Sequence, residues 1–288
     1  MRVHHLNCGT MCPFGAKLVN GEGGLFAAGR MVCHCLLIET NDGLVLVDTG
    51  LGLDDVREGS ARLGAPFMWA TRARLDENET AARQVEKLGW KREDVRHIVP
   101  THLDLDHAGG LADFPKATVH IFEPEHTAAL HPRTTAEENR YRQAHWAHGP
   151  KWNILSLEGE TWNGFDSVRA VAGVGTDVLL VPLIGHTRGH VGVAVKTGDR
   201  WIFHGGDAFF SRQEIESPPS CPPSLRLFQR LVAIDNTKRL ASQARLRELA
   251  RTHAHDVDVV SAHCPFTFDR FAGGAAQTTA SANGVAVA

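Results

Sequence analysis

The amino-acid sequence predicts an α/β fold in which helices cover β-sheets. Two observations carry this prediction. Short runs of β-branched and apolar residues recur along the chain and end in glycine-containing turns, and segments of good helix formers lie between several of them. Sheets that bury a face against helices have this mixture. No linker interrupts residues 1–271, so we expect one domain there. Residues 272–288 are small and polar, which predicts a disordered tail.

The first half of the chain contains most of the predicted strands. A turn at residues 40–43, Thr-Asn-Asp-Gly, joins two β-rich runs into a hairpin. The segment 123–149 is polar, rich in histidine and predicted to be helical. We expect strands from Val3 onward and over residues 32–39, 44–48, 95–99 and 117–122, and a helix over residues 79–88.

The second half continues the pattern with shorter strands and longer helices. Glycine-containing turns separate three of its strands. A helical stretch over residues 225–254 is interrupted near residues 234–236. The predicted strands are 178–184, 191–196, 201–204 and 257–261.

Composition excludes several classes of protein. The 288 residues are 43% hydrophobic and 22% charged, as in ordinary globular proteins, and no apolar stretch is long enough to span a membrane. The N-terminus turns polar before a signal-peptide core develops, so we expect a cytoplasmic protein whose six cysteines are free thiols. The net charge of −3 argues against a nucleic-acid partner and leaves a small molecule as the expected one. The sequence allows a homodimer.

Histidine is abundant, with seventeen residues, and several cluster with carboxylates. His102, Asp104, Asp106 and His107 fall within six residues directly after the strand predicted at 95–99. Imidazole and carboxylate groups are the usual ligands of zinc, manganese and iron in hydrolytic sites. Four such groups this close together predict a site for two metal ions.

Three other predicted strand ends present the same residue types. A Gly-His-Thr-Arg-Gly-His loop at 185–190 lies between two strands, one strand leads into Asp207, and the last leads into His263. Any one of these histidines alone is more simply read as an ordinary core or surface residue. Together with the first cluster they are difficult to explain without a metal.

These motifs, in this order, resemble the metallo-β-lactamase-fold hydrolases. The resemblance covers most of residues 32–268 and also rests on Val-Asp-Thr-Gly at 47–50. It implies a four-layer αββα sandwich with the site at the sheet edges. For one metal it implies the ligands His102, Asp104 and His190, for the other Asp106, His107 and His263, with Asp207 bridging both. Asp48, His186 and His204 are expected to orient these ligands.

Asp104 departs from the family pattern. Most members carry histidine at this position, and flavodiiron proteins carry glutamate. A carboxylate adds a negative charge to the site, which should move its preference from zinc toward iron or manganese. The alternative is that Asp104 binds no metal and leaves one position weak or empty.

Such a pair of metals would activate a bridging water for hydrolysis, with Asp106 and Asp207 positioning it and one carboxylate carrying a proton to the leaving group. The pattern is most similar to the N-acyl-homoserine lactonase branch. Those enzymes commonly carry a tyrosine three residues after the bridging aspartate, where this chain has Phe210. That difference weakens the lactone assignment but leaves an ester, lactone or thioester substrate open.

The expected substrate pocket draws on variable segments. The sole tyrosine, Tyr141, and Trp146 belong to the histidine-rich segment, which is equally compatible with a solvated helix pair. Arg188 could meet an anionic group of the substrate or simply pair with a nearby carboxylate.

Three alternatives to a lactonase or esterase remain. One is a thioester hydrolase of glyoxalase II type. Another, motivated by Asp104, is a diiron redox protein of flavodiiron type, which would need a separate electron-delivering partner. A third is a binding protein with a vestigial site, although none of the seven ligand positions has been replaced by an apolar residue.

Overall fold

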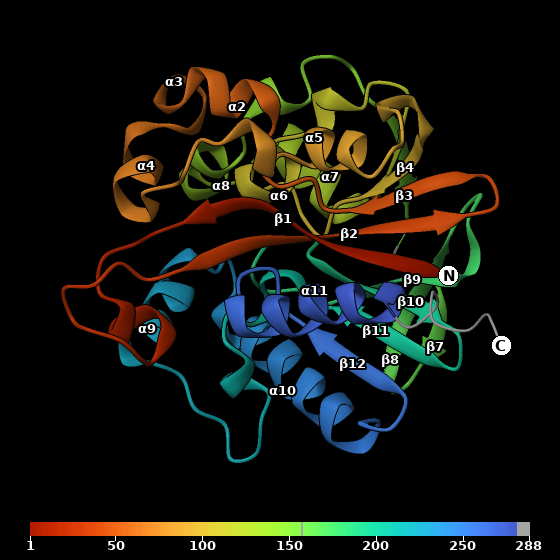
Figure 1. Ribbon diagram of the computed structural model, residues 1–288. Helices are drawn as coiled ribbons and strands as arrows, with labels where there is room; N and C mark the ends of the chain where they lie inside the picture. Colours follow the sequence, from red (N-terminus) through yellow and green to blue (C-terminus); the bar gives the residue numbers. More distant parts are fainter. Residues whose placement is uncertain (157, 281–288) are drawn as a thin grey trace, which may run out of the picture.

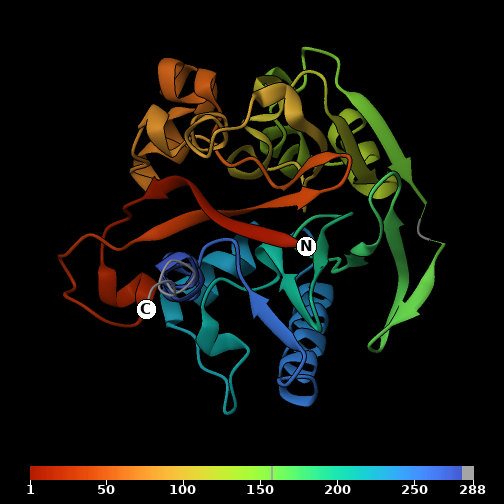
Figure 2. The ribbon, with the colours of Figure 1, turned by 45° about the vertical axis from the view of Figure 1, so that its right-hand side comes forward.

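The computed structural model of the chain describes residues 1–156 and 158–280 and contains two six-stranded sheets that face each other (Figure 1). The strand order is β1-β2-β3-β4-β5-β6 in the first sheet and β12-β11-β10-β9-β8-β7 in the second. Each sheet therefore follows one half of the chain. Helices cover the two outer faces, which completes the four-layer αββα sandwich that we predicted (Figures 1 and 2).

The first sheet begins with an antiparallel pair and continues with parallel neighbours. β1 pairs with β2 and β2 with β3 in antiparallel register, whereas β3, β4, β5 and β6 run parallel. The carboxyl ends of these parallel strands lie at one edge, where open sheets place their ligands. The strands are β1 (Arg2–Met11), β2 (Met31–Thr40), β3 (Gly43–Val47), β4 (Val95–Val99), β5 (Thr118–Phe122) and β6 (Lys151–Leu155).

The second sheet is antiparallel except for its last pair. β11 and β12 run parallel, so the residues that follow them leave the sheet at the same edge. The loop between antiparallel β9 and β10 also lies there. The strands are β7 (Glu160–Trp162), β8 (Phe165–Val171), β9 (Gly175–Pro182), β10 (Val191–Thr197), β11 (Arg200–His204) and β12 (Val257–Val260).

The helices fall into two groups along the sequence. Helices α2 to α8 lie over the first sheet, and α10 lies against the second (Figures 1 and 2). α11 packs on β1 and β2, where the ring of Phe268 lies 5.2 Å from that of His34. The helices are α1 (Ala16–Asn20), α2 (Leu53–Glu58), α3 (Ser60–Leu63), α4 (Ala65–Thr71), α5 (Ala81–Lys87), α6 (Leu105–Ala108), α7 (Glu123–Leu130), α8 (Thr135–Arg140), α9 (Pro223–Val232), α10 (Asn236–Thr252) and α11 (Pro265–Ala280).

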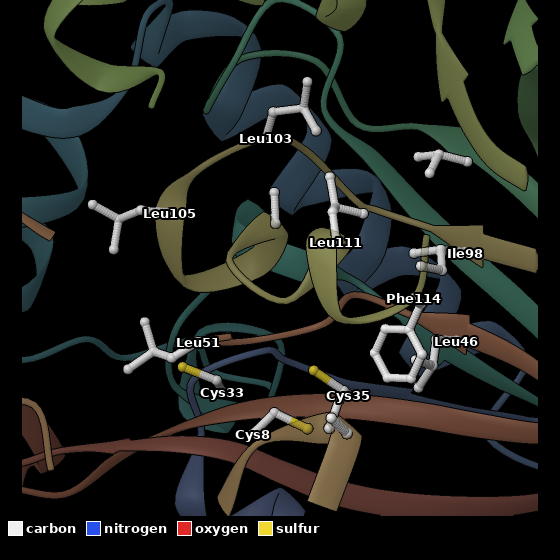
Figure 3. Packing of buried hydrophobic residues seen from close by; sticks show 14 of the residues in the cluster. Cys8, Cys33, Cys35, Leu46, Leu51, Ile98, Leu103, Leu105, Leu111 and Phe114 are labelled. Atoms are coloured by element: carbon white, nitrogen blue, oxygen red, sulfur yellow. The ribbon is translucent and has the colours of Figure 1, made fainter. Parts of the chain in front are cut away.

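Period-two alternation divides the apolar side chains between separate cores. Leu36 and Ile38 of β2 face the second sheet and pack with residues such as Val193, while Leu37 between them faces the helices. Figure 3 shows part of the core on the helix side, with Leu46 among its members. Each fully buried aliphatic side chain of this kind stabilises the fold by about 1.5–3 kcal/mol. The sandwich thus holds the loops at its edge on a rigid base.

Most predicted elements are present, with a few differences. The break in the long helix is confirmed between α9 and α10. The prediction missed β6, β7 and β8, and it missed the helices between residues 16 and 71. Residues 272–280 belong to α11 where we expected a disordered tail, and 281–288 lie outside the described residues. No helix of the described residues is long and apolar enough to cross a membrane.

Candidate metal centre

Asp48 lies where β3 ends and fastens the loop that carries most of the candidate ligands. Its Oδ1 accepts a hydrogen bond from the backbone N–H of Thr101 (2.6 Å), and its Oδ2 accepts one from the Thr101 hydroxyl (2.9 Å). Oδ2 also lies 2.8 Å from Nδ1 of His107, which must be the donor because a carboxylate only accepts. The Nε2 atom of His107 is therefore left free to face the centre. These are the contacts expected of a residue that orients a ligand.

One group of atoms that could ligate a metal lies around Nε2 of His102. Its Nε2 lies 3.3 Å from Oδ2 of Asp104 and 3.9 Å from Oδ2 of Asp207. Nε2 of His186 lies 3.1 Å from the same Asp104 atom and 3.3 Å from the same Asp207 atom. His102, His186 and Asp207 each offer a donor atom within 4.8 Å of the others, and all three are buried. This is a set of donors that can surround one cation.

A second group gathers around His107 and His263. Their Nε2 atoms are 3.3 Å apart, and they lie 3.3 Å and 3.1 Å from Oδ1 of Asp207. Oδ2 of Asp106 lies 3.6 Å from Nε2 of His263. Nδ1 of His263 donates to the carbonyl of Val32 (2.8 Å), which leaves its Nε2 as an acceptor. Two imidazole acceptors that face each other at this distance need a positive charge between them.

Asp207 stands between the two groups, with Oδ2 toward His102 and His186 and Oδ1 toward His107 and His263. Nε2 of His102 and Oδ1 of Asp207 are buried and have no hydrogen-bond partner among the described residues. Buried polar atoms normally have a partner, so a bound cation would satisfy these two atoms. The residues present thus suit a pair of divalent metal ions.

The electrostatics of the site agree with this fit. Burial opposes charging of His107, yet Asp207 and Asp48 raise its pKa well above the usual value. Burial likewise opposes ionisation of Asp207, but His263, His107 and His186 hold its pKa well below the usual value. The carboxylates therefore draw positive charge into a buried site. A metal ion supplies that charge without protonating the rings.

His190 has a different place from the one we expected. Its Nε2 accepts a hydrogen bond from the backbone N–H of Asp207 (2.9 Å), and its Nδ1 donates to the carbonyl of Leu183 (3.1 Å). Both ring nitrogens of His190 therefore have a hydrogen-bond partner in this structure. Nε2 of His186, which we expected to act behind the ligands, lies near the first group and is also 3.2 Å from Nη2 of Arg140. The cluster of ligand-type atoms around His102 thus contains His186.

Asp104 does approach the first group, but it also has a partner that the sequence did not reveal. Its Oδ1 lies 2.9 Å from Nε of Arg140, the last residue of α8, and its Oδ2 faces His102 and His186. Coulombic attraction from Arg140 and His102 outweighs burial and holds the pKa of Asp104 well below its usual range. Asp104 is therefore ionised and positioned at the edge of the centre.

The remaining predicted site residues divide into near and distant ones. Phe210 places its ring 4.9 Å from that of His263, at an angle of 30°. His204 lies behind the ligands, where its Nε2 donates to the carbonyl of His34 (2.7 Å) and its Nδ1 accepts from the N–H of Gly206 (3.3 Å). Phe210 thus forms part of the wall beside the second group, and His204 holds the turn that precedes Asp207.

The other three expected pocket residues have internal partners. Nε of Arg188 lies 2.6 Å from Oε1 of Glu137, the carboxylate pairing that was the alternative for this arginine. The hydroxyl of Tyr141 donates to Glu125 (3.1 Å), so this phenol is not directed at the metal centre. Trp146 is buried in the core beneath the helices of the first sheet. Arg188 nevertheless lines an open pocket, together with Arg133 and Lys238.

Three residues near the centre were absent from the predicted set. Glu125 is fully buried and accepts from the hydroxyl of Thr187 (2.6 Å) and the N–H of Gly189 (3.1 Å), which fixes the loop carrying His186. Arg140 forms an ion pair with Asp104. The Cys33 thiol lies within 4.8 Å of donor atoms of Asp106 and His263. No spacing rule signals any of them, because each comes from a segment distant in sequence from the residues it contacts.

Each of the six cysteines is a free thiol, as predicted.

Comparisons with known proteins agree with the fold and place the chain in a family. Residues 28–251 match the family model described as the metallo-beta-lactamase superfamily. A probable metallo-hydrolase of Mycobacterium tuberculosis is 45% identical over 265 residues, which is 92% of this chain and 81% of that protein. An N-acyl homoserine lactonase of Bacillus thuringiensis is 24% identical over 225 residues, 78% of this chain and 81% of that protein.

Two solved structures share the fold. An N-acyl homoserine lactone hydrolase with the product N-hexanoyl-L-homoserine at its catalytic metal centre gives a TM-score of 0.68 at 20% identity, covering 92% of this chain and 94% of that one. AidC, a dizinc quorum-quenching lactonase, gives a TM-score of 0.57 at 18% identity, covering 91% and 87%. At these identities the likeness is one of fold.

Proposed function

This chain belongs to the metallo-β-lactamase superfamily and is a metal-dependent hydrolase, and from this premise we propose that it uses a dinuclear centre to hydrolyse a small carbonyl ester or lactone. We assign His102, His186 and Asp104 to one metal ion and Asp106, His107 and His263 to the other. Asp207 is the carboxylate shared by both.

One observation carries the proposal more than any other. The two oxygens of Asp207 face different histidine pairs, with Oδ2 3.3 Å from Nε2 of His186 and Oδ1 3.1 Å from Nε2 of His263. A carboxylate held between two sets of imidazoles suits a pair of metal ions, one on each side. The product-bound and dizinc lactonases of the same fold support a two-metal site and a lactone substrate for this chain.

The chain's own side chains divide the work around such a centre. Bound divalent metal ions would lower the pKa of a shared water toward neutrality and polarise a substrate carbonyl. Asp106 and Asp207 would orient that water, and Asp106, whose side chain is 14% exposed, would be the better placed to carry a proton from it to the leaving group. Phe210 keeps bulk water away from the His263 side of the site. Asp48 and His190 hold the ligands and Asp207 in place.

The substrate assignment rests on weaker support than the reaction class. The 24% identical lactonase favours a lactone, whereas Phe210 supplies no hydroxyl where the lactonase branch commonly has one. A thioester would undergo the same chemistry and is an outcome of the substrate test. The motive for a diiron redox centre was the charge of Asp104, and the ion pair with Arg140 offsets that charge.

Metal analysis and a substrate panel test the proposal together. Protein purified without chelators is expected to hold about two metal ions per chain and to hydrolyse N-acyl lactones or aryl esters. Zinc, iron and manganese are quantified separately, because the dizinc relative points to zinc while a carboxylate ligand favours harder metals. About one metal ion or fewer, or turnover of none of the lactones, esters and thioesters, would contradict the proposal.

A matched pair of variants tests the choice between the two loop histidines. His186→Gln removes a proposed ligand, so metal content should fall to about one ion per chain with loss of activity. His190→Gln keeps a side-chain oxygen near the N–H of Asp207 and should retain both ions with a lower unfolding temperature. The reverse pattern would assign the ligand to His190.

A further inference from the structure

Arg140 is a buried cation at the edge of the proposed metal centre. Its side chain is 10% exposed, and it ends α8, far along the chain from the ligand motif. The guanidinium contacts three segments of the chain, and its Nη2 also lies 3.2 Å from Nε2 of His186. Nε faces Asp104 (2.9 Å), Nη1 donates to the carbonyl of His186 (2.9 Å), and Nη2 donates to the carbonyl of Val232 (2.8 Å).

Asp104 has one oxygen for this arginine and one for the centre. Oδ1 faces Arg140, while Oδ2 lies 3.1 Å from Nε2 of His186 and 3.3 Å from Nε2 of His102. The carboxylate cannot rotate freely, because turning Oδ1 toward the centre would break the contact with the guanidinium. Arg140 therefore fixes which oxygen is offered and in which direction.

The ion pair of Asp104 and Arg140 also determines the net charge beside His102 and His186. A buried carboxylate adds one negative charge, and the buried guanidinium beside it adds one positive charge. Together they form a neutral unit with one oxygen lone pair directed at His102 and His186. Removing either partner would leave an uncompensated buried charge, which is the costly way to break such a pair.

We propose that Asp104 and Arg140 act as one neutral ligand unit of the first metal ion, with Arg140 as the positioning residue that aims Asp104. This inference rests on the proposed dinuclear function and goes beyond it by assigning a role to a residue outside the ligand motif. Because Arg140 also holds the backbone of His186, it connects two of the proposed ligands of that ion. Loss of Arg140 should weaken the first ion and leave the second in place.

A double-mutant cycle tests whether Asp104 and Arg140 act together on the first metal ion. The variants are Arg140→Met, Asp104→His and the double variant Asp104→His/Arg140→Met. Histidine is a neutral ligand, so the double variant replaces one neutral unit by another. Arg133→Met is the matched control, because Arg133 lies in the same segment with an exposed side chain. The readouts are metal ions per chain after dialysis and metal affinity in competition with a chelator.

We expect each single variant to bind the first ion roughly 10- to 100-fold more weakly, the usual effect of losing a residue that supports a ligand. In Asp104→His the weakening comes from the guanidinium left beside an uncharged ring. The double variant should lose clearly less affinity than the two single variants combined, because it leaves no unpaired charge, although it still lacks the hydrogen bonds of Arg140 to the carbonyls of His186 and Val232. The Arg133→Met control should bind both ions normally.

Two results would overturn the inference: an Arg140→Met protein with unchanged affinity for both ions, or a double variant that loses as much as the two single changes combined. If Arg140→Met fails to fold, the double variant provides the test. A double variant that is unfolded, or that holds only one metal ion, would contradict the inference. Failure of the proposed function is distinguishable, because it would show as fewer than two ions or no hydrolysis in the natural protein itself.

Discussion

Oδ2 of Asp48 lies 2.8 Å from Nδ1 of His107, and this hydrogen bond determines which nitrogen of the His107 ring faces the metal centre. The same carboxylate accepts two hydrogen bonds from Thr101. Asp48 has a φ of 56°, a left-handed conformation that asparagine adopts as readily as aspartate. An asparagine at this position therefore changes the hydrogen bonding without a new backbone cost.

Asp48→Asn should lower metal affinity and activity by roughly 10- to 100-fold, because the amide is uncharged and offers one acceptor oxygen to three donors. Chelator competition and turnover of the best substrate measure the two effects. Asp42→Asn, at an exposed position in the β2–β3 turn, is the control and should change neither. Unchanged metal affinity in Asp48→Asn would mean that His107 is oriented by other contacts.

The ligand motif could be predicted because strand ends are readable in a sequence. Short runs of β-branched, aliphatic and aromatic residues identify β3, β4, β11 and β12, and parallel neighbours bring the residues after them to one edge. Asp48, His102, Asp207 and His263 follow from that rule. The fold class follows from the same runs.

Which of His186 and His190 lies nearer the first group could not be predicted in this way. Both lie in one glycine-containing loop, and spacing does not say which ring has a free nitrogen. That depends on the N–H of Asp207, which reaches His190 from a different strand end. Arg140 and Glu125 could not be predicted for a related reason. Their partners lie in other segments of the chain, and no motif connects those positions in the sequence. The strands over residues 151–171 carry polar residues and short apolar runs, so periodicity was weak there.

Glu125 should be among the most sensitive positions outside the metal ligands. Its Oε2 accepts from Thr187 and Gly189, and its Oε1 accepts from the N–H of Leu103 (3.0 Å) and the hydroxyl of Tyr141 (3.1 Å). In Glu125→Gln the side-chain NH₂ replaces one of the two oxygens, so it faces hydrogen-bond donors at a position where an acceptor is needed. We expect a loss of roughly 3 kcal/mol in the free energy of unfolding, measured by urea denaturation.

Two further variants sharpen that measurement. Tyr141→Phe removes only one of the four hydrogen bonds and should cost about 1 kcal/mol. Because its hydroxyl faces Glu125, this change should leave the rate of hydrolysis nearly unaltered. Glu123→Gln, an exposed change in the same helix, should have no effect on stability. A Glu125→Gln protein as stable as Glu123→Gln would show that water or rearrangement satisfies the donors.

Asp113 should make stability depend on pH. Burial raises its pKa from 3.8 to about 6, although the N–H of Leu53 donates to its Oδ2 (3.0 Å). The folded state therefore holds this proton more tightly than the unfolded state. Its contribution to stability is fully present below about pH 4 and is lost as pH rises through about 6.

Asp113→Asn removes that dependence and keeps an acceptor for Leu53. At about pH 7.5 the variant should be more stable than the natural protein by up to about 3 kcal/mol, since one pKa unit corresponds to about 1.4 kcal/mol. At about pH 4 the two should be equally stable. Denaturation of both proteins at each pH supplies the comparison, and effects of the metal centre cancel in the difference. A gain of the same size at both pH values would assign the effect to packing instead of charge.

Phe210 offers a test of the substrate assignment. Its ring lies against His263 and packs edge-on to Phe228, with ring centroids 5.8 Å apart. Phe210→Tyr adds one hydroxyl beside the centre, at the position where the resembling lactonases commonly carry tyrosine. An added donor near a developing oxyanion should raise kcat for lactones. The gain should be smaller than the roughly 100- to 1,000-fold loss that follows removal of an established donor.

The control for this change separates the hydroxyl from the shape of the wall. Phe210→Leu keeps an apolar side chain without a ring or a donor, so it should leave the preference among lactones, esters and thioesters unchanged while lowering stability by about 1–3 kcal/mol. Comparing kcat across the three substrate classes for both variants provides the measurement. If Phe210→Tyr favours no class over the others, the hydroxyl does not reach the reacting carbonyl. The natural phenylalanine would then not explain any difference in substrate between this chain and its lactonase relatives.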